Sequence, residues 1–252
     1  MILILGGTSD SLKICSKLNE LKKEYILSVT TNYGLEIANT YTDNIVVDKM
    51  SYEKMNEFID KKQINFIIDA THPYAVEVSK NAIRCSKNKD IKYIRYERKS
   101  LLEDVDYDKA YIVDSLDRAC EYANNVGTNI FVSTGSKNLS TIVDKVDKNL
   151  IVRVLPTSEV LLSCEKLGLN ADNIIAMKGP FNKEINQEFY KHYNIDLVLT
   201  KESGVEGGFL EKVESCKELD IPIVIISRDT IDYPNKVQNV EDVELIINSW
   251  GY

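Results

Sequence analysis

Short runs of apolar, largely β-branched residues alternate with amphipathic segments along almost the whole chain, and this rhythm is what most constrains the fold. In the amino-terminal part the apolar runs are Ile2–Leu5, Ile26–Val29, Ile45–Val47, Phe66–Ile68 and Tyr93–Ile94. Between them, segments such as Tyr52–Ile59 and Ala75–Cys85 have helical spacing. Continuous apolar strands separated by helices are typical of a parallel sheet that is covered on both faces.

The same rhythm repeats in the carboxy-terminal part. Its strand-like runs are Tyr111–Val113, Ile130–Val132, Leu150–Leu155, Ile174–Met177, Leu197–Leu199 and Ile223–Ile226. Helical spacing recurs in Ser158–Leu167, Lys183–Tyr193, Leu210–Leu219 and Val243–Trp250. One sheet of about ten strands remains an option, but two smaller sheets are favoured because large open sheets are uncommon.

The charged segment Glu97–Asp108 interrupts this rhythm and is the best candidate boundary. We therefore expect an α/β protein of two domains, residues 1–98 and 109–252. Each domain is expected to hold a mainly parallel sheet with helices on both faces, and the two to face each other across a cleft. Ligands of open α/β sheets bind beyond the carboxyl ends of the strands, so the strand-end loops are the places to look for a site.

Net charge and apolar content exclude several classes of protein. The formal net charge of -8 over 252 residues argues against a nucleic-acid partner, because such proteins use a basic face to neutralise phosphates. No apolar stretch reaches the roughly 18 residues of a membrane span. The start Met1–Gly7 resembles a buried strand rather than a signal peptide, so a cytoplasmic protein is expected.

Cysteine and histidine are too few and too scattered for a metal site. The cysteines are Cys15, Cys85, Cys120, Cys164 and Cys216. They are far apart and form no C-x-x-C pair, so small buried helix residues are the favoured interpretation over metal binding or thiol catalysis. With only two histidines, a His-rich metal centre is excluded and no metal is expected.

Two loops of the amino-terminal half carry candidate ligand contacts. Gly6-Gly7-Thr8 follows the first strand and lets the backbone approach a ligand, although it is not G-x-G-x-x-G and could simply be a turn before a helix capped by Ser9 or Asp10. Asp69–Ala75 follows the fourth strand and presents His72 and Tyr74 as donors or proton carriers. A capped helix start with a structural histidine is the alternative for this second loop.

Cations gather at the other strand ends of this net-acidic chain. Arg95 and Arg98 follow the fifth strand and could hold carboxylates, or else pair with Glu97 or a neighbouring acid. Thr134-Gly135-Ser136-Lys137 resembles a phosphate cradle, with a simple helix cap by Ser136 or Asn138 as the alternative. The cations at consecutive strand ends of the second half are Lys137, Arg153, Lys178, Lys201 and Arg228. One rim of cations favours a strongly anionic ligand or a pair of ligands.

Taken together, these motifs resemble the precorrin-6A reductase family, including the cobalt-precorrin-6A reductases of the anaerobic corrin pathway. The matching motifs, in family order, are Gly6–Thr8, Asp69–Ala75, Arg95–Arg98, Thr134–Lys137, Arg153–Pro156, Gly179–Phe181 and Thr200–Gly204 with Gly207–Gly208. One position departs, since Arg228 is followed here by Asp229 where family members often have proline.

This resemblance implies two Rossmann-like domains and the NADPH-dependent reduction of one macrocycle double bond, giving precorrin-6B in cobalamin biosynthesis. The cofactor contacts it implies are Thr134, Gly135, Ser136, Lys137, Arg153, Lys201, Glu202, Ser203, Gly204, Gly207 and Gly208. The substrate contacts expected are Gly7, Thr8, His72, Tyr74, Arg98, Lys178 and Arg228. Tyr74 and His72 are the candidate catalytic proton donors, with solvent as the alternative.

Two other classes of function remain open at this point. A non-redox two-domain module that closes on an anionic metabolite or sugar nucleotide would need the same cleft without cofactor turnover. A transferase acting on tetrapyrroles would instead bind S-adenosylmethionine. The sequence does not decide whether the substrate carries cobalt, although richness in Ile, Lys and Asn gives a weak indication of an anaerobe. A monomer is expected.

Overall fold

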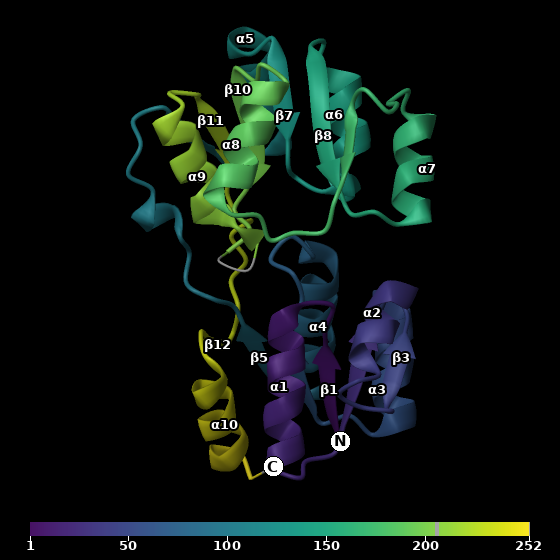
Figure 1. The fold of residues 1–252 in the computed structure, drawn as a ribbon. Helices are drawn as coiled ribbons and strands as arrows, with labels where there is room; N and C mark the ends of the chain where they lie inside the picture. Colours follow the sequence, from purple (N-terminus) through teal and green to yellow (C-terminus); the bar gives the residue numbers. More distant parts are fainter. Residues whose placement is uncertain (205–206, 252) are drawn as a thin grey trace. The chain divides into compact units, whose positions relative to one another are not determined.

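The computed structural model describes residues 1–204 and 207–251, and the chain divides into two compact units (Figure 1). The first unit comprises Met1–Lys99 together with the carboxy-terminal segment from Asp229 onward, and the second comprises Ser100–Arg228. Each unit contains its own parallel sheet with helices on both faces, which confirms the predicted fold class.

The first unit is built around a six-stranded sheet within the part of the chain that the structure describes. Its strands are β1 (Ile2–Leu5), β2 (Tyr25–Val29), β3 (Ile45–Val47), β4 (Phe66–Asp69), β5 (Lys92–Tyr96) and β12 (Lys236–Val237). Its helices are α1 (Ser9–Glu20), α2 (Asn32–Ala38), α3 (Tyr52–Lys62), α4 (Val76–Lys89) and α10 (Val240–Ser249). The strand order is β12-β5-β4-β1-β2-β3, and every pairing is parallel.

The two faces of this sheet have separate apolar cores. One core joins the sheet to α1 and α10, through residues such as Ile14, Leu18, Val243 and Ile247. The other joins it to α3 and α4, through Met55, Ile59, Ala82 and Cys85. Right-handed crossovers explain this division, because α1 connects strands in one direction along the sheet and α3 and α4 in the other.

The carboxy-terminal segment from Asp229 onward belongs to the first unit, whereas the predicted boundaries assigned all of residues 109–252 to the second domain. The structure places β12 beside β5, with Lys236 opposite Arg95 and Val237 opposite Tyr96. The backbone amide of Arg95 donates to the carbonyl of Asn235 at 2.8 Å. A strand of two residues leaves no periodic pattern in the sequence, which is why its return to the first sheet was not predicted.

Helix α10 should therefore contribute directly to the stability of the first unit. Ile247 is fully buried against the core shared with α1, whereas Leu245 on the same helix is 65% exposed. We expect Ile247→Ala to lower the free energy of unfolding by about 2–5 kcal/mol. The matched substitution Leu245→Ala should change it by less than about 0.5 kcal/mol. Urea unfolding monitored by the fluorescence of Trp250 measures both, and equal effects would contradict the assignment of α10 to this core.

The second unit is built on the same plan. Its strands are β6 (Ala110–Val113), β7 (Asn129–Val132), β8 (Asn149–Val154), β9 (Ile174–Ala176), β10 (Leu197–Lys201) and β11 (Ile223–Ile226). Its helices are α5 (Leu116–Val126), α6 (Leu139–Lys145), α7 (Ser158–Lys166), α8 (Lys183–His192) and α9 (Phe209–Glu218), with short 3-10 turns at Leu102–Asp104 and Ser136–Asn138. The strand order is β6-β11-β10-β7-β8-β9, again all parallel.

Both sheets reverse their strand order at one point, and ligands of open α/β sheets bind beyond the carboxyl ends of the strands at such a point. In the first unit the reversal lies between β1 and β4, and in the second between β7 and β10. These four strands lead into the loops that begin at Gly6, Ala70, Ser133 and Glu202. The topology therefore brings the predicted site loops of each unit together in pairs.

Candidate functional site

In the first unit, the loops after β1 and β4 are joined by a hydrogen bond. The hydroxyl of Thr8 donates to the carbonyl oxygen of Ala70 at 2.8 Å. Thr8 is also the N-cap of α1, since its side chain accepts from the amide of Ser11, so neither Ser9 nor Asp10 has the capping role considered from sequence. Gly7 has φ 101°, a conformation that favours glycine, and a Cβ on Gly6 would lie 2.6 Å from a methyl of Leu27.

The two candidate proton donors lie side by side in the loop after β4. The rings of His72 and Tyr74 are 5.5 Å apart between centroids, and both residues are half-buried. The amide of Tyr74 donates to Nδ1 of His72 at 3.3 Å, and the amide of Ala75 donates to the carbonyl of His72 at 2.8 Å. Because Nδ1 accepts, the neutral ring carries its proton on Nε2.

The two arginines at the end of the fifth strand, Arg95 within β5 and Arg98 after it, have different environments. Arg98 is part-exposed, and its Nε donates to Oδ2 of Asp10 at 2.6 Å while Nη2 donates to Ser9 at 3.2 Å. This contact places Arg98 beside the Gly7–Thr8 loop. Arg95 is fully buried and pairs with Asp69 and Glu97, so the alternative considered from sequence, pairing with Glu97 or a neighbouring acid, holds for Arg95 and, through Asp10, for Arg98.

In the second unit, a hydrogen bond joins the loop after β7 to the end of β10, since the hydroxyl of Ser133 donates to that of Thr200 at 3.0 Å. In this loop, Thr134 is buried, Gly135 has φ 80°, and Ser136 and Lys137 are exposed on a 3-10 turn. Asn138 stands at the N-cap of α6 without a side-chain capping bond, and Ser136 is not the capping residue. The capping alternative for this loop therefore lacks the expected hydrogen bond.

Cations of the second unit lower the pKa of two of its lysines. Burial and the nearby charge of Lys137 lower the pKa of Lys201 to about 8. Burial and the charges of Arg153 and Lys201 lower the pKa of Lys212 to about 7. Because these charges act on one another, we treat cations from β8, β10, α9 and the Thr134–Lys137 loop as one group. We call this group the cation cluster: Lys137, Arg153, Lys201 and Lys212. An anion bound among them would relieve the repulsion.

Arg153 has no carboxylate partner among residues 1–204 and 207–251. Its guanidinium lies over the ring of Phe181 at 4.0 Å and over that of Phe131 at 5.1 Å, and Nη1 donates to Oδ1 of Asn186 at 2.7 Å. Only 7% of Arg153 is exposed, and burial lowers its pKa to about 10. A buried cation held by aromatic rings and an amide is preorganised to accept an anionic ligand.

Lys212 was not predicted from the sequence. It lies in α9, is 5% exposed, and donates to the carbonyl of Gly207 at 2.8 Å and to the hydroxyl of Ser203 at 3.3 Å. It therefore ties together the two described ends of the predicted Ser203–Gly208 loop, of which residues 205–206 lie outside the described part of the chain. The sequence did contain a signal for it, because Lys212 occupies a position on the apolar face of the helix, one turn after Gly207-Gly208.

Three further predicted residues lie at the same edge of the second sheet. Glu202 is 1% exposed, its Oε1 lies 3.0 Å from Nε of Arg228, and it accepts from the amide of Leu101 at 3.3 Å. Lys178 is exposed after β9. Glu202 thus has internal partners in Arg228 and Leu101.

The buried lysines give the cofactor-free protein a pH dependence. Because the pKa of Lys212 is about 7 in the folded state and about 10.4 when unfolded, the unfolded chain binds more protons between those values. The contribution of Lys212 to stability should therefore rise as pH increases from about 7 to about 10, with roughly one proton taken up by Lys212 on unfolding. The buried thiols, whose pKa values are raised, act in the opposite sense above about pH 8.5. Lys212→Met should therefore make the slope of stability against pH less positive than in the wild type, whereas Lys87→Met, at an exposed lysine, should not. Urea unfolding at several pH values in this range measures the slope of stability against pH. The same slope in all three proteins would contradict a lowered pKa for Lys212.

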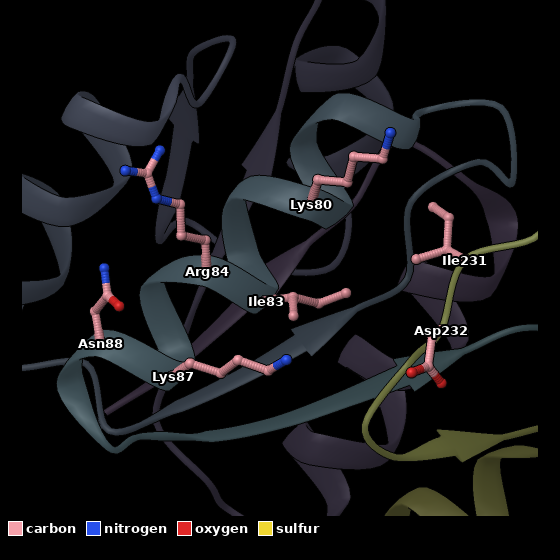
Figure 2. Close-up of a pocket in the computed structure, with 7 residues that line it drawn as sticks. All are labelled: Lys80, Ile83, Arg84, Lys87, Asn88, Ile231 and Asp232. Atoms are coloured by element: carbon pink, nitrogen blue, oxygen red, sulfur yellow. The ribbon is translucent and has the colours of Figure 1, made fainter.

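A pocket of about 320 Å³ lies elsewhere, on the first unit, between α4 and the segment that precedes β12 (Figure 2). It is lined by Lys80, Ile83, Arg84, Lys87, Asn88, Ile231 and Asp232. Figure 2 shows the charged ends of Lys80, Arg84 and Lys87 pointing in different directions rather than into a common centre. Arg84 instead lies over the ring of Tyr52 at 3.9 Å. None of the predicted site residues lines this pocket.

Other features bear on the expectations from composition. The cysteines at positions 15, 85, 120, 164 and 216 are all buried thiols, as expected, and burial raises the pKa of Cys15 to about 11. Within residues 1–204 and 207–251, no three His, Cys, Asp or Glu side chains are grouped so that they could hold a metal ion. In the same part of the chain, no helix combines the length and apolar character needed to cross a membrane.

Comparison with known proteins gives one consistent relationship. Residues 1–249 match the family described as Precorrin-6x reductase CbiJ/CobK. The chain is 35% identical over 230 residues to the cobalt-precorrin-6A reductase of Salmonella typhimurium, covering 91% of this chain and 88% of that protein. It is 36% identical over 244 residues to that of Methanocaldococcus jannaschii, covering 96% of each.

The fold comparison agrees with the sequence comparison. A solved structure titled CobK precorrin-6A reductase superposes with a TM-score of 0.81 over 99% of this chain and 97% of that one, at 18% identity. At that identity the structural match supports the two-domain α/β fold alone, while the family follows from the sequence matches. The resemblance inferred from the strand-end motifs is thereby confirmed, and the chain belongs to the precorrin-6x reductase CbiJ/CobK family.

Proposed function

We propose that this protein reduces one macrocycle double bond of cobalt-precorrin-6A, or of precorrin-6A, to the corresponding precorrin-6B in cobalamin biosynthesis, with NADPH as the reductant. The family supports the reaction, since a reductase of this kind uses a nicotinamide cofactor. Relatives at 35% and 36% identity are named for the cobalt complex, whereas the Rhodococcus erythropolis protein named precorrin-6A reductase is 23% identical. This difference favours the cobalt-containing substrate.

The cation cluster is the observation that carries the choice of NADPH. Arg153 and Lys212 are almost fully buried, and the charge of Arg153 helps to lower the pKa of Lys212. Burying the guanidinium of Arg153 without a carboxylate partner among the described residues is costly, and a phosphorylated dinucleotide supplies several phosphate charges. When bound, the nicotinamide ring supplies a hydride.

The loops of the second unit have donors suited to phosphate oxygens. The proposed contacts beside the cluster are Thr134, Gly135, Ser136, Ser203, Gly204, Gly207 and Gly208. Gly135, Gly204 and Gly208 all have positive φ, a conformation that favours glycine and in which the backbone can approach a ligand closely. In this proposal Glu202 supports the loop through Arg228 and Leu101.

In the first unit, the proposed substrate contacts converge from three strand ends. Gly7 and Thr8 follow β1, His72 and Tyr74 follow β4, and Arg98 follows β5. The substrate carries many carboxylates, and Arg98 beside Asp10 supplies a guanidinium for one of them. Lys178 and Arg228 of the second unit are proposed as further carboxylate contacts.

Reduction of a double bond also requires a proton at the carbon that does not receive the hydride. Nε2 of His72 and the hydroxyl of Tyr74 are the proposed donors, because both side chains lie in the loop beside the β1–β4 reversal. His72→Asn and Tyr74→Phe distinguish the two candidate donors, because each substitution removes one of the groups that could donate the proton and preserves most of the side chain's size.

The direct test is turnover of purified cobalt-precorrin-6A under anaerobic conditions. We expect nicotinamide absorbance to fall only when protein, NADPH and the tetrapyrrole are all present, and to fall much more slowly with NADH. Thermal stabilisation by a sugar nucleotide or by S-adenosylmethionine, without stabilisation by NADPH, would favour a non-redox module or a transferase instead. We further propose a monomer, which light scattering of the purified protein tests.

A further inference from the structure

A buried ion pair lies directly beneath the loop that carries His72 and Tyr74. Nη1 of Arg95 donates to Oδ1 of Asp69 at 2.8 Å, and both side chains are 0% exposed. Asp69 is the last residue of β4, and Arg95 is its partner in register on β5. The pair therefore stands where the strand ends and the loop begins.

The carboxylate of Asp69 is held by donors on both oxygens. Oδ1 accepts from the amide of Thr71 at 3.1 Å and from its hydroxyl at 2.7 Å, in addition to Arg95. Oδ2 accepts from the hydroxyl of Tyr93 at 2.9 Å. The hydroxyl of Thr71 also accepts from Nη1 of Arg95 at 3.0 Å, so Thr71 is fixed through both its backbone and its side chain.

The network continues outward to the carboxy-terminal segment. Nε and Nη2 of Arg95 both reach Oε2 of Glu97 at 3.3 Å, and Oε1 of Glu97 accepts from Lys236 at 2.7 Å. The guanidinium of Arg95 lies 5.2 Å from the ring centre of Tyr233. The segment that returns to form β12 thus completes the surroundings of Arg95.

Stability alone does not explain why this network of buried charges is present. Buried ion pairs often contribute no more than well-packed apolar residues of the same size, because both charges lose their hydration. What the network supplies is a fixed position for Thr71, one residue before His72. Burial and the charge of Asp69 raise the pKa of Tyr93, so its hydroxyl remains a neutral donor to the carboxylate.

We infer that Asp69, Tyr93 and Arg95 are positioning residues, which fix Thr71 and thereby place His72 and Tyr74 for the reaction. The inference rests on the proposed function, since it assigns a role in substrate turnover. It predicts that weakening the network without unfolding the protein will displace the loop and slow the reaction. Outer contacts of this kind commonly change activity by about 10- to 100-fold.

Tyr93→Phe is the sharpest test because it removes one hydroxyl and leaves the buried ring. Tyr25→Phe is the matched control, since Tyr25 is equally buried in β2 of the same sheet and its hydroxyl donates to Asn19 at 3.0 Å, away from the loop. We expect Tyr93→Phe to lower kcat/KM for the tetrapyrrole by about tenfold or more, and Tyr25→Phe by less than about twofold. Both should keep the wild-type Kd for NADPH, which binds to the second unit in this proposal.

Hydrogen exchange of the cofactor-free protein supplies a readout that does not depend on turnover. The amides of residues 70–75 should exchange faster in Tyr93→Phe than in the wild type, and at the wild-type rate in Tyr25→Phe. A loss of activity without faster exchange in this loop would overturn the inference, because the effect would not act through loop position. Equal activities of the two variants would overturn it as well.

Thr71 provides an independent test through a conservative replacement. Thr71→Val keeps the shape but removes the hydroxyl that joins Asp69 to Arg95, whereas Thr71→Ser keeps the hydroxyl. We expect the valine variant to lose about tenfold or more in kcat/KM and the serine variant to recover most of it. If the wild type does not oxidise NADPH with the tetrapyrrole, the proposed function fails; if it does and valine and serine behave alike, only this inference fails.

Discussion

Replacing Arg153 with methionine is expected to weaken NADPH binding by about 10- to 150-fold, while the cofactor-free protein stays folded. A hydrogen bond to a charged group contributes roughly 1.5–3 kcal/mol, which corresponds to that range of Kd. The folded state should tolerate the change because Arg153 has no carboxylate partner among the described residues, so no buried anion is left behind. Its removal leaves Oδ1 of Asn186 without that donor, at a cost of about 1–3 kcal/mol, which loss of a desolvated cation offsets.

Calorimetric titration with NADPH measures the change in Kd, and thermal unfolding without cofactor measures the change in stability. Arg118→Met is the matched control, because Arg118 lies in the same unit at an exposed i,i+4 pair with Asp114, and its replacement should leave Kd unchanged. An unchanged Kd in Arg153→Met would remove the cation cluster as the basis for choosing NADPH. A large loss of stability without cofactor would show that Arg153 is mainly structural.

Replacing Arg95 with methionine is expected to cause a large loss of stability, in contrast to the replacement of Arg153. The carboxylate of Asp69 would remain fully buried with its hydrogen-bond donors Thr71 and Tyr93 but without a compensating charge. Breaking a buried ion pair from one side costs about 3–5 kcal/mol. Burial alone would lower the pKa of Arg95, but the combined charges of its neighbours, Asp69 foremost and Glu97 among them, raise it above its usual value.

Urea unfolding of the wild type, Arg95→Met and Lys236→Met tests this expectation. Lys236 stands at the exposed end of the same network, 42% exposed and paired with Glu97, so its replacement should cost less than about 1 kcal/mol. Adding Asp69→Asn to Arg95→Met should restore part of the lost stability, since the unpaired charge is removed with it. A single Arg95→Met variant as stable as Lys236→Met would contradict the buried ion pair.

The fold was predictable because its signals are local in the sequence. Apolar runs such as Ile2–Leu5 and Ile130–Val132 form strands β1 and β7, and the loops that follow them lie where each sheet reverses its strand order. Helix α2 and the two-residue strand β12 were not predicted, because short elements give little periodic signal. The loops of the candidate site were predicted on the same local grounds, from glycines and cations that directly follow apolar runs.

What the sequence by itself determined is the two parallel sheets, the family, and the loops that carry the candidate contacts. Only the tertiary structure decided which side chains meet: Lys212 with Ser203, Glu202 with Arg228, and Asp69 with Arg95. It also decided that the chain from Asp229 onward returns to the first sheet. The physical reason is that apolar periodicity is set by neighbours along the chain, whereas burial and charge pairing depend on strand register and on segments far apart in sequence.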